Sequence, residues 1–520
     1  MLRGRVYLLG VGPGDPELIT QRASRRLAEA DVIFYDALAH PELLELCRRD
    51  AEKVFVGRRD ERASTTVERM IASAREGNIV ARLEGEDSHR WGCGSEEAEA
   101  LHAAGVPFEI VPGVSAPNAV SVYAGIPLTH RSSASSVAYV IATESTEKSC
   151  SSHDWAKLAT ATETLVISAE MHRLESIMRL LVAHGRRSDT PAALVESVSL
   201  PRQRTIVATV ETIAERAHEA GVGTPTLTVI GDVVQLRDAL RWYDRKPLFG
   251  RRVLVTRPED RSEAMVRRLR DEGAEAIALA AIRIAPPLDP APLERAARDA
   301  GTYDWVIFTS ASGVDAFFAE LERQERDGRA FGTAKICAIG PATAEALRRH
   351  GLRADAIPTE FRGEGAARVI IDAHEGDPSG LRILLPRAEV AREVLPDTLR
   401  NAGAHVDVVH AYRNLPASKE TEEAIRHAIT EREVDVVTFT APSTVASMVR
   451  ILGEDAPRML AQLTTASIGP ITTAAAVKHA IRIDVTAQSY TGDGLVDALR
   501  EHCVAPLGRL VSSIAHEEEG

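Results

Sequence analysis

The segment Val253-Leu254-Val255-Thr256-Arg257 returns later in the chain as Ile383-Leu384-Leu385-Pro386-Arg387. Three more segments recur in the same way: 304–309 as 435–440, 339–341 as 468–470, and 363–365 as 492–494. A near-constant spacing of about 130 residues across these motifs indicates a duplicated α/β unit rather than a short solenoid repeat. Two similar lobes on one chain create a cleft, and clefts between lobes are common ligand sites.

The bulk composition limits the class of protein. With 520 residues, the chain is too long for one hydrophobic core, and we expect two to four domains. A hydrophobic content of 44% with 26% charged residues is ordinary for a globular protein. No apolar run of about 18 residues is present, so we expect no membrane-spanning segment. The N-terminal sequence lacks the pattern of a signal peptide.

Cysteine usage and net charge limit the cellular compartment in which the protein can work and the kinds of ligand that it can bind. The 5 cysteines lie far apart and form no CxxC pair, which favours a reduced, cytoplasmic environment. The formal net charge of -13 argues against nonspecific nucleic-acid binding, because the phosphate backbone is itself negative. A small anionic substrate remains compatible, since it needs only a local group of arginines.

The repeat of about 130 residues begins after residue 250 and is absent before residue 242, so we predict a linker at 242–250. Before it, apolar runs alternate with helical patterns, which indicates α/β structure with a mostly parallel sheet. A helix is expected from Thr20, and another over 174–184, where Gly185 is a fitting C-terminal stop. The expected strands are 6–10, 32–35, 79–83 and 108–111 in a first lobe (about 1–133), and 137–141, 164–167, 192–196 and 226–230 in a second (about 134–245).

Hydroxyl side chains follow two equivalent strands of the repeat. Thr309, Ser310 and Ser312 come after one strand, and Ser443 and Thr444 come after its copy. Free backbone N–H groups at a helix N-terminus can bind a carboxylate together with hydroxyls, although the same residue types also cap helices routinely. Because the loops are duplicated and are expected to face one cleft, we interpret them as ligand-binding loops. The Ile-Gly-Pro turns of the repeat contain no Walker lysine, which excludes a P-loop.

The second half of the chain resembles the uroporphyrinogen-III synthase family. The resemblance implies two lobes of duplicated flavodoxin-like α/β units, one from about 250–285 plus 415–510 and the other from about 288–412. The implied substrate is hydroxymethylbilane, a linear tetrapyrrole with eight carboxylates, which loses its terminal hydroxyl, inverts its last pyrrole and closes into a ring. The resemblance covers about 250–510 and rests on the segments 253–258, 308–314, 339–347, 411–413, 439–444 and 468–476.

The same resemblance assigns roles to particular residues. Tyr412 matches the family tyrosine thought to assist departure of the hydroxyl, as a weak acid or hydrogen-bond donor. The two hydroxyl loops would bind substrate carboxylates together with Arg257 and Arg387, because a planar guanidinium suits that contact. The implied reaction depends on positioning rather than on a nucleophile, a metal or a cofactor.

The first half resembles the tetrapyrrole methylases, most closely the uroporphyrinogen-III C-methyltransferases. Coverage is about 5–245, and the motifs are 10–15, 35–36, 56–59, 85–87, 94–97, 111–116 and 124–131. The glycine turn at 10–15 is not the dinucleotide GxGxxG pattern, because its third glycine comes one residue early. The family binds S-adenosylmethionine between two α/β lobes and methylates two ring carbons to give precorrin-2. By position, the cofactor site would contain Pro13, Gly85, Glu86, Asp87, Arg90, Ser115, Ala116, Ala169 and Val198.

Two charged residues match the family's proposed proton carriers. Asp36 follows a strand and matches the proton acceptor, with a helix cap or an ion pair as the alternative explanation. Arg58 stands where the family usually has a proton-donating lysine, and a guanidinium does not readily release its proton. We expect no metal site, because the spacing of His89, Cys93 and His130 fits no zinc signature.

Departures from the methylase pattern leave two hypotheses for the first half. Glu86 and Val198 replace family glycines, and 168–170 replaces Tyr-Met-Gly. In one hypothesis, a cytoplasmic fusion enzyme makes uroporphyrinogen III and methylates it toward siroheme or cobalamin, since one half supplies the substrate of the other. In the other, only the synthase is active, and the first half is a degenerate dimerisation or product-binding module. The resemblance also suggests a homodimer through the methylase half, with tetrapyrroles as substrates and no nucleic-acid or membrane partner.

Overall fold

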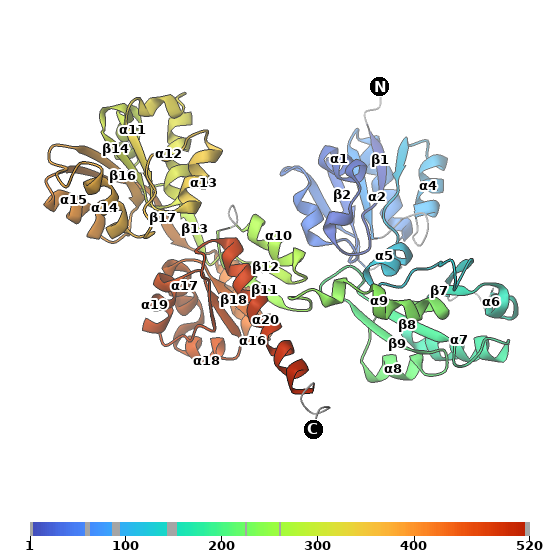
Figure 1. The fold of residues 1–520 in the computed structure, drawn as a ribbon. Helices are drawn as coiled ribbons and strands as arrows, with labels where there is room; N and C mark the ends of the chain where they lie inside the picture. The colour runs from blue at the N-terminus through green and yellow to red at the C-terminus, as the bar shows by residue number, and fades with distance from the viewer. Residues whose placement is uncertain are drawn as a thin grey trace. The chain divides into compact units, whose positions relative to one another are not determined.

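A computed structural model describes residues 4–57, 63–85, 94–142, 153–223, 226–258 and 262–514. The chain divides into two compact units, Met1–Gly250 and Arg251–Gly520. Within the described ranges, each unit contains two five-stranded sheets with helices packed on them, which confirms the predicted α/β class (Figure 1). A search of the described helices finds none that is both long and apolar enough to span a membrane.

The first sheet of unit 1 contains β1 (Arg5–Gly10), β2 (Val32–Tyr35), β3 (Glu52–Phe55), β4 (Ile79–Glu84) and β5 (Phe108–Val111), with helices α1 (Gln21–Glu29), α2 (Ala63–Arg75) and α4 (Gly94–Ala103). All strand pairs are parallel, in the order β3-β2-β4-β1-β5. Alternation along β1 buries both faces, since Tyr7 and Leu9 pack on the α1 side and Val6 and Leu8 pack on the α2 and α4 side.

The second sheet of unit 1 contains β6 (Val137–Ile141), β7 (Thr164–Ser168), β8 (Pro191–Glu196), β9 (Arg204–Thr209) and β10 (Thr226–Ile230), in the order β6-β7-β10-β8-β9. It is a mixed sheet, because β10 runs antiparallel to both of its neighbours and β9 is antiparallel to β8. Its helices are α5 (Ala116–Tyr123) on one face and α6 (Trp155–Ala161), α7 (Met171–Ala183) and α8 (Ile213–Glu219) on the other.

The strands and helices predicted for the first half are present. Thr20 caps α1 by accepting the Ala23 N–H, and Gly185 follows the end of α7 at φ +100. Strands β3 and β9 were not predicted, because both are edge strands whose exposed positions break the apolar run. The predicted linker at 242–250 packs on unit 1 instead of running free. Tyr243 in η4 (Tyr243–Arg245) and Leu248 are both buried.

One sheet of unit 2 has the order β12-β11-β18-β19-β20, and the other has the order β13-β17-β16-β14-β15. The first contains β11 (Arg252–Val255), β12 (Glu275–Ala278), β18 (Val436–Phe439), β19 (Thr464–Ser467) and β20 (Val485–Thr486), with α10 (Glu263–Asp271), α16 (Lys419–Thr430), α17 (Pro442–Leu452), α18 (Ala456–Leu460), α19 (Pro470–Lys478) and α20 (Gly492–Ile514). The second contains β13 (Ile282–Ala285), β14 (Trp305–Phe308), β15 (Lys335–Ala338), β16 (Arg382–Ala388) and β17 (His405–Pro416), with α11 (Ala291–Arg298), α12 (Ala311–Arg323), α13 (Pro341–Arg349), α14 (Gly363–Asp372) and α15 (Val394–Asn401).

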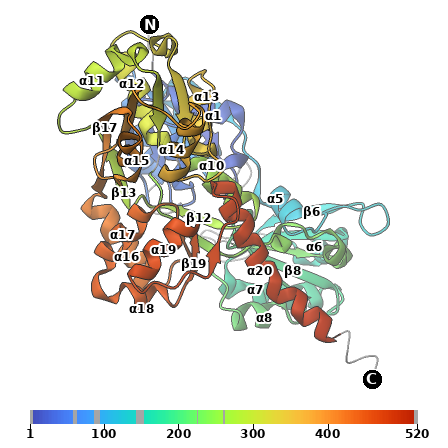
Figure 2. The same ribbon diagram turned by 60° about the vertical axis from the view of Figure 1, so that its left-hand side comes forward.

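The sequence repeat is visible in these orders, but each sheet mixes the two copies. The run β12-β11-β18-β19 has the same arrangement as β17-β16-β14-β15. Strands β11 and β12 of the first copy therefore share a sheet with β18 and β19 of the second, and β11 pairs with β18. Figure 1 shows β11, β12 and β18 of this sheet, and Figure 2 shows β12 and β19 in the turned view. Strands β13 and β17 pair antiparallel at the point where the chain passes from one sheet to the other.

Candidate functional site

In unit 2 the structure brings Tyr412 together with one of the predicted hydroxyl side chains. The Ser310 Oγ lies 3.1 Å from the Tyr412 phenol oxygen and also accepts the Gly313 N–H at 3.0 Å. Ser310 caps α12 after β14, and Tyr412 lies on β17, so the order β17-β16-β14 joins residues far apart in the sequence. Tyr412 is only 8% exposed. Its hydroxyl is therefore fixed by packing and by the helix cap.

This hydroxyl pair exists in only one copy of the repeat. The residue that caps the equivalent helix α17 is Ala441, which has no side-chain bond to offer. At the repeat spacing of about 130 residues, Ile282 on β13 takes the place of Tyr412. The positions equivalent to Ser310 and Tyr412 thus carry Ala441 and Ile282, neither of which has a hydroxyl, and this favours a specific chemical role for the Ser310–Tyr412 pair.

The other predicted hydroxyl side chains differ in burial and in their hydrogen bonds within the protein. Thr309 is half-buried after β14, and Ser312 is buried in the first turn of α12. Ser443 is half-buried in the first turn of α17. Thr444 is buried, and its Oγ1 donates to the Ala441 carbonyl at 2.7 Å. A local bond to the Ala441 carbonyl therefore occupies the Thr444 hydroxyl, and helix capping partly occupies that of Ser310, whereas Thr309 and Ser443 keep exposed surface.

The two predicted arginines also have partners within the protein. Arg387 on β16 is 5% exposed, donates to the Arg392 carbonyl at 3.0 Å and forms an ion pair with Glu393. Its guanidinium therefore holds the loop after β16. Arg257 follows β11, and its Nη1 lies 3.3 Å from the place that a Cβ on Gly492 would occupy, at the start of α20.

An aromatic pair that sequence analysis missed joins the two sheets of unit 2. The rings of Phe361 and Tyr490 meet edge to face, with centroids 6.2 Å apart. Each ring covers the glycine of one Ile-Gly-Pro turn: a Cβ on Gly340 would lie 3.3 Å from Phe361, and one on Gly469 would lie 2.8 Å from Tyr490. The signal was present in the repeat, because Phe361 and Tyr490 occupy equivalent positions before its Gly-Glu-Gly and Gly-Asp-Gly motifs.

In unit 1 the predicted cofactor turn packs against the loop that contains Val198. A Cβ on Gly14 would lie 2.9 Å from the Val198 carbonyl oxygen, and the Asp15 N–H donates to the Ser199 Oγ at 3.0 Å. The turn that contains Pro13 therefore lies next to the Val198 loop. Ser197 and Ser199 have positive φ angles of 52° and 67°. Left-handed backbone at two non-glycine residues costs energy, and such strain concentrates at functional sites.

The start of α5 supplies the other wall of this region. Ser115 is the N-cap of α5, is 2% exposed, and its Oγ has no hydrogen-bond partner among the residues that the structure describes. Ala116 and Val198 belong to the same hydrophobic cluster. A buried hydroxyl without a partner costs free energy unless a ligand or water pairs with it. Ser115 therefore fits a site that binds a polar molecule.

Asp36 lies in a buried group of charges at the ends of β2 and β4. Its Oδ1 accepts the Leu38 N–H at 3.0 Å, and its Oδ2 is 3.4 Å from Arg82, which also faces Glu97 at 3.3 Å. Burial lowers the pKa of Arg82, but attraction to Glu97, Asp36 and Glu84 outweighs it, so the pKa is raised. The guanidinium thus stays charged between Asp36 and Glu97. Asp36 therefore forms an ion pair, which was the alternative explanation for this residue. The ion pair does not prevent Asp36 from acting as a proton acceptor.

The remaining predicted positions fall around this centre or outside the described ranges. Gly85 sits under Leu38, because a Cβ there would lie 2.6 Å from the Leu38 Cβ. Ala169 follows β7 and packs against the core on the α7 side. No metal-binding group of His, Cys, Asp or Glu occurs among the described residues. Arg58, Glu86, Asp87 and Arg90, like His89 and Cys93, lie outside the described residues.

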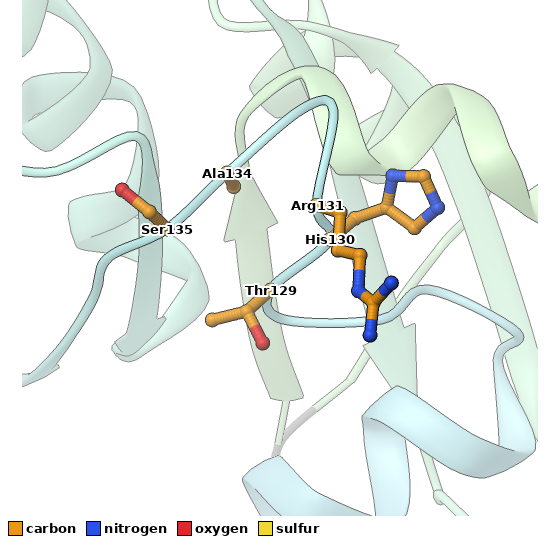
Figure 3. A pocket seen from close by; sticks show the side chains of 5 residues that line it. All are labelled: Thr129, His130, Arg131, Ala134 and Ser135. Carbon is orange, nitrogen blue, oxygen red and sulfur yellow. The ribbon is translucent and has the colours of Figure 1, made fainter.

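A pocket of about 630 Å³ lies in the loop between α5 and β6 (Figure 3). It is lined by Thr129, His130, Arg131, Ala134 and Ser135. The His130 Nδ1 is 2.9 Å from the Ser132 hydroxyl, while the Arg131 guanidinium and the Thr129 hydroxyl both offer donors. A cation with neighbouring hydroxyls in a pocket suits the carboxylate of a ligand.

These features define an α/β enzyme with one candidate site in each unit. The family model "Uroporphyrinogen-III synthase HemD" matches residues 263–497, and "Tetrapyrrole (Corrin/Porphyrin) Methylases" matches residues 5–214. The chain is 34% identical over 505 residues to a porphyrin biosynthesis protein HemD from Ruminiclostridium josui, which covers 96% of this chain and 98% of that protein. The chain therefore belongs to the family that fuses a tetrapyrrole methylase to a uroporphyrinogen-III synthase, and it is a bifunctional enzyme of tetrapyrrole biosynthesis.

Further relatives match mainly the first unit. A uroporphyrinogen-III C-methyltransferase from Bacillus subtilis is 35% identical over 362 residues, 69% of this chain and 74% of that protein. A siroheme synthase from Acinetobacter baylyi is 44% identical over 244 residues, but the match spans only 53% of that protein. A solved uroporphyrin-III C-methyltransferase from Thermus thermophilus, complexed with S-adenosylhomocysteine, is 37% identical over 45% of this chain and 100% of that one, with a TM-score of 0.40.

Proposed function

We propose that unit 2 converts hydroxymethylbilane to uroporphyrinogen III with Tyr412 as its catalytic residue. The observation that carries this assignment is the Ser310–Tyr412 hydrogen bond, which is absent from the equivalent place in the other copy of the repeat. Because the Ser310 Oγ already accepts the Gly313 N–H, its own proton is available to the phenol oxygen. The Tyr412 proton then points to the substrate. There it donates to the departing hydroxyl as the carbon–oxygen bond breaks.

We propose that unit 1 binds S-adenosylmethionine between the Gly12–Asp15 turn, the Val198 loop and the start of α5. The cofactor would supply an already activated methyl group. The unpartnered Ser115 Oγ and the strained Ser197–Ser199 segment support this placement. Asp36, which lies 3.4 Å from the Arg82 guanidinium, accepts the proton that leaves the methylated ring carbon. The Arg131 pocket binds a carboxylate of the tetrapyrrole.

We also propose a cytoplasmic homodimer that forms through the methylase unit. Family resemblance is the basis for the dimer, and Cys47, Cys337 and Cys503, which are free thiols in the described ranges, suit a reducing compartment. Light scattering of the full chain tests the dimer, and a monomer at micromolar concentration would contradict it.

One experiment tests both activities. The purified chain is incubated with hydroxymethylbilane, with and without S-adenosylmethionine, and the products are separated by chromatography and identified by mass. We expect the type III ring without the cofactor and two added methyl groups with it. Only the type I ring, which forms spontaneously, would refute the synthase assignment. Type III without methylation would instead support the hypothesis that the first half is a binding or dimerisation module.

A further inference from the structure

A buried tyrosine lies in the segment that leads from unit 1 toward unit 2. Tyr243 is 5% exposed and meets Tyr123 and Phe249 edge to face, with ring centroids 4.9 Å and 5.3 Å apart. The Lys246 Nζ lies 5.2 Å from the centre of the same ring. Burial, together with the nearby Asp15 carboxylate, raises the pKa of Tyr243. The phenol therefore keeps its proton and remains a hydrogen-bond donor throughout the physiological range.

The Tyr243 hydroxyl donates to the Ser199 carbonyl at 2.8 Å. Ser199 is 1% exposed and has the left-handed φ of 67°. Two further bonds hold it: its N–H donates to the Gln203 Oε1 at 3.0 Å, and its Oγ accepts the Asp15 N–H at 3.0 Å. A strained residue persists only where its surroundings over-determine it. The Tyr243 bond is one of the three that hold Ser199.

We propose that Tyr243 is a positioning residue for the methyl donor, acting through Ser199 on the Gly12–Asp15 turn. The chain of contacts is continuous, from the Tyr243 phenol to the Ser199 carbonyl and from the Ser199 Oγ to the Asp15 N–H. The turn also packs closely on the Val198 loop, because a Cβ on Gly14 would lie 2.9 Å from the Val198 carbonyl oxygen. The inference rests on the proposed placement of S-adenosylmethionine in unit 1.

The test is Tyr243→Phe in the full chain, which removes only the hydroxyl and keeps the aromatic packing. Titration calorimetry with S-adenosylhomocysteine should show binding about three- to tenfold weaker, the effect of one hydrogen bond. Steady-state kinetics should show a higher KM for S-adenosylmethionine with an unchanged kcat, because Tyr243 touches no reacting atom. The matched control is Tyr303→Phe, which loses a phenol bond to Asp407 in unit 2 and should leave this affinity unchanged.

A double-mutant cycle with Ser199→Ala gives the decisive readout. If Tyr243 acts through Ser199, the two losses of affinity are non-additive, because either change already frees the turn. Additive losses, or an affinity in Tyr243→Phe equal to that of the parent with only a lower melting temperature, would overturn the inference. A parent chain that binds no S-adenosylhomocysteine would instead overturn the proposed cofactor site, so the two failures are distinguishable.

Discussion

Replacing Tyr412 by phenylalanine should slow ring closure while leaving the fold intact. The ring of Tyr412 packs in the core beneath α12, and phenylalanine preserves that packing. Only the 3.1 Å bond to Ser310 is lost, which costs about 1 kcal/mol of stability at most. In the proposed mechanism the same oxygen donates to the departing hydroxyl in a partly desolvated site. Removing one such donor costs about 2.7 kcal/mol, or about a 100-fold decrease in kcat.

Single-turnover quenching with chromatographic separation of the type I and type III rings measures this effect directly. As the enzymatic rate falls, spontaneous closure competes, so the type III fraction should fall as well. Tyr303→Phe is the control, since Tyr303 lies in the same part of unit 2 and its hydroxyl donates to Asp407 at 2.9 Å. An unchanged rate and an unchanged type III fraction in Tyr412→Phe would refute the reasoning.

Three further changes address unit 1. Asp36→Asn keeps an acceptor for the Leu38 N–H but removes the base, so methyl transfer measured by product mass should fall about 100-fold while ring closure stays unchanged. Ser115→Ala should weaken S-adenosylhomocysteine binding about three- to tenfold without lowering the melting temperature, because the Ser115 Oγ has no partner among the described residues. Unchanged binding with a lower melting temperature would contradict the assignment of Ser115 to the cofactor site. The Ser136 hydroxyl and the N–H groups of Ser135 and Ser136 lower the pKa of Glu163 to about 2. Glu163 thus adds stability that is present above its ordinary value of 4.5 and is lost as pH falls through about 2, so Glu163→Gln should melt earlier than the parent at pH 7, with a difference that shrinks toward pH 2.

The strands of the first half could be predicted because buried strands of an α/β sheet appear as short apolar runs. The exceptions show the limit of that signal. Strand β3 contains Glu52 and Lys53, and β9 begins with Arg204, so neither forms such a run. Both lie at sheet edges, where one side meets water, and their strand conformation depends on pairing with a neighbour.

The candidate sites were only partly predictable. Family resemblance pointed separately to Tyr412 and Ser310, but their contact depends on β14 and β17 lying on either side of β16. The contact of Tyr243 with Ser199 gave no local signal. The repeat placed Phe361 and Tyr490 at equivalent positions but did not show that their rings meet. Helical and strand periodicities report which face of an element is buried. They do not report which distant segment covers that face.

By itself, the sequence determined the α/β class and the duplication in the second half, because both are encoded in local apolar patterns and in a fixed repeat spacing. The tertiary structure decided that each sheet of unit 2 takes strands from both copies of the repeat, and that only one copy carries a Ser–Tyr pair. It also decided that Tyr243 and Leu248 of the predicted linker are buried, and that Tyr243 contacts Phe249 edge to face. The physical reason is that such contacts join surfaces far apart along the chain, and they form only where whole sheets and loops fit together.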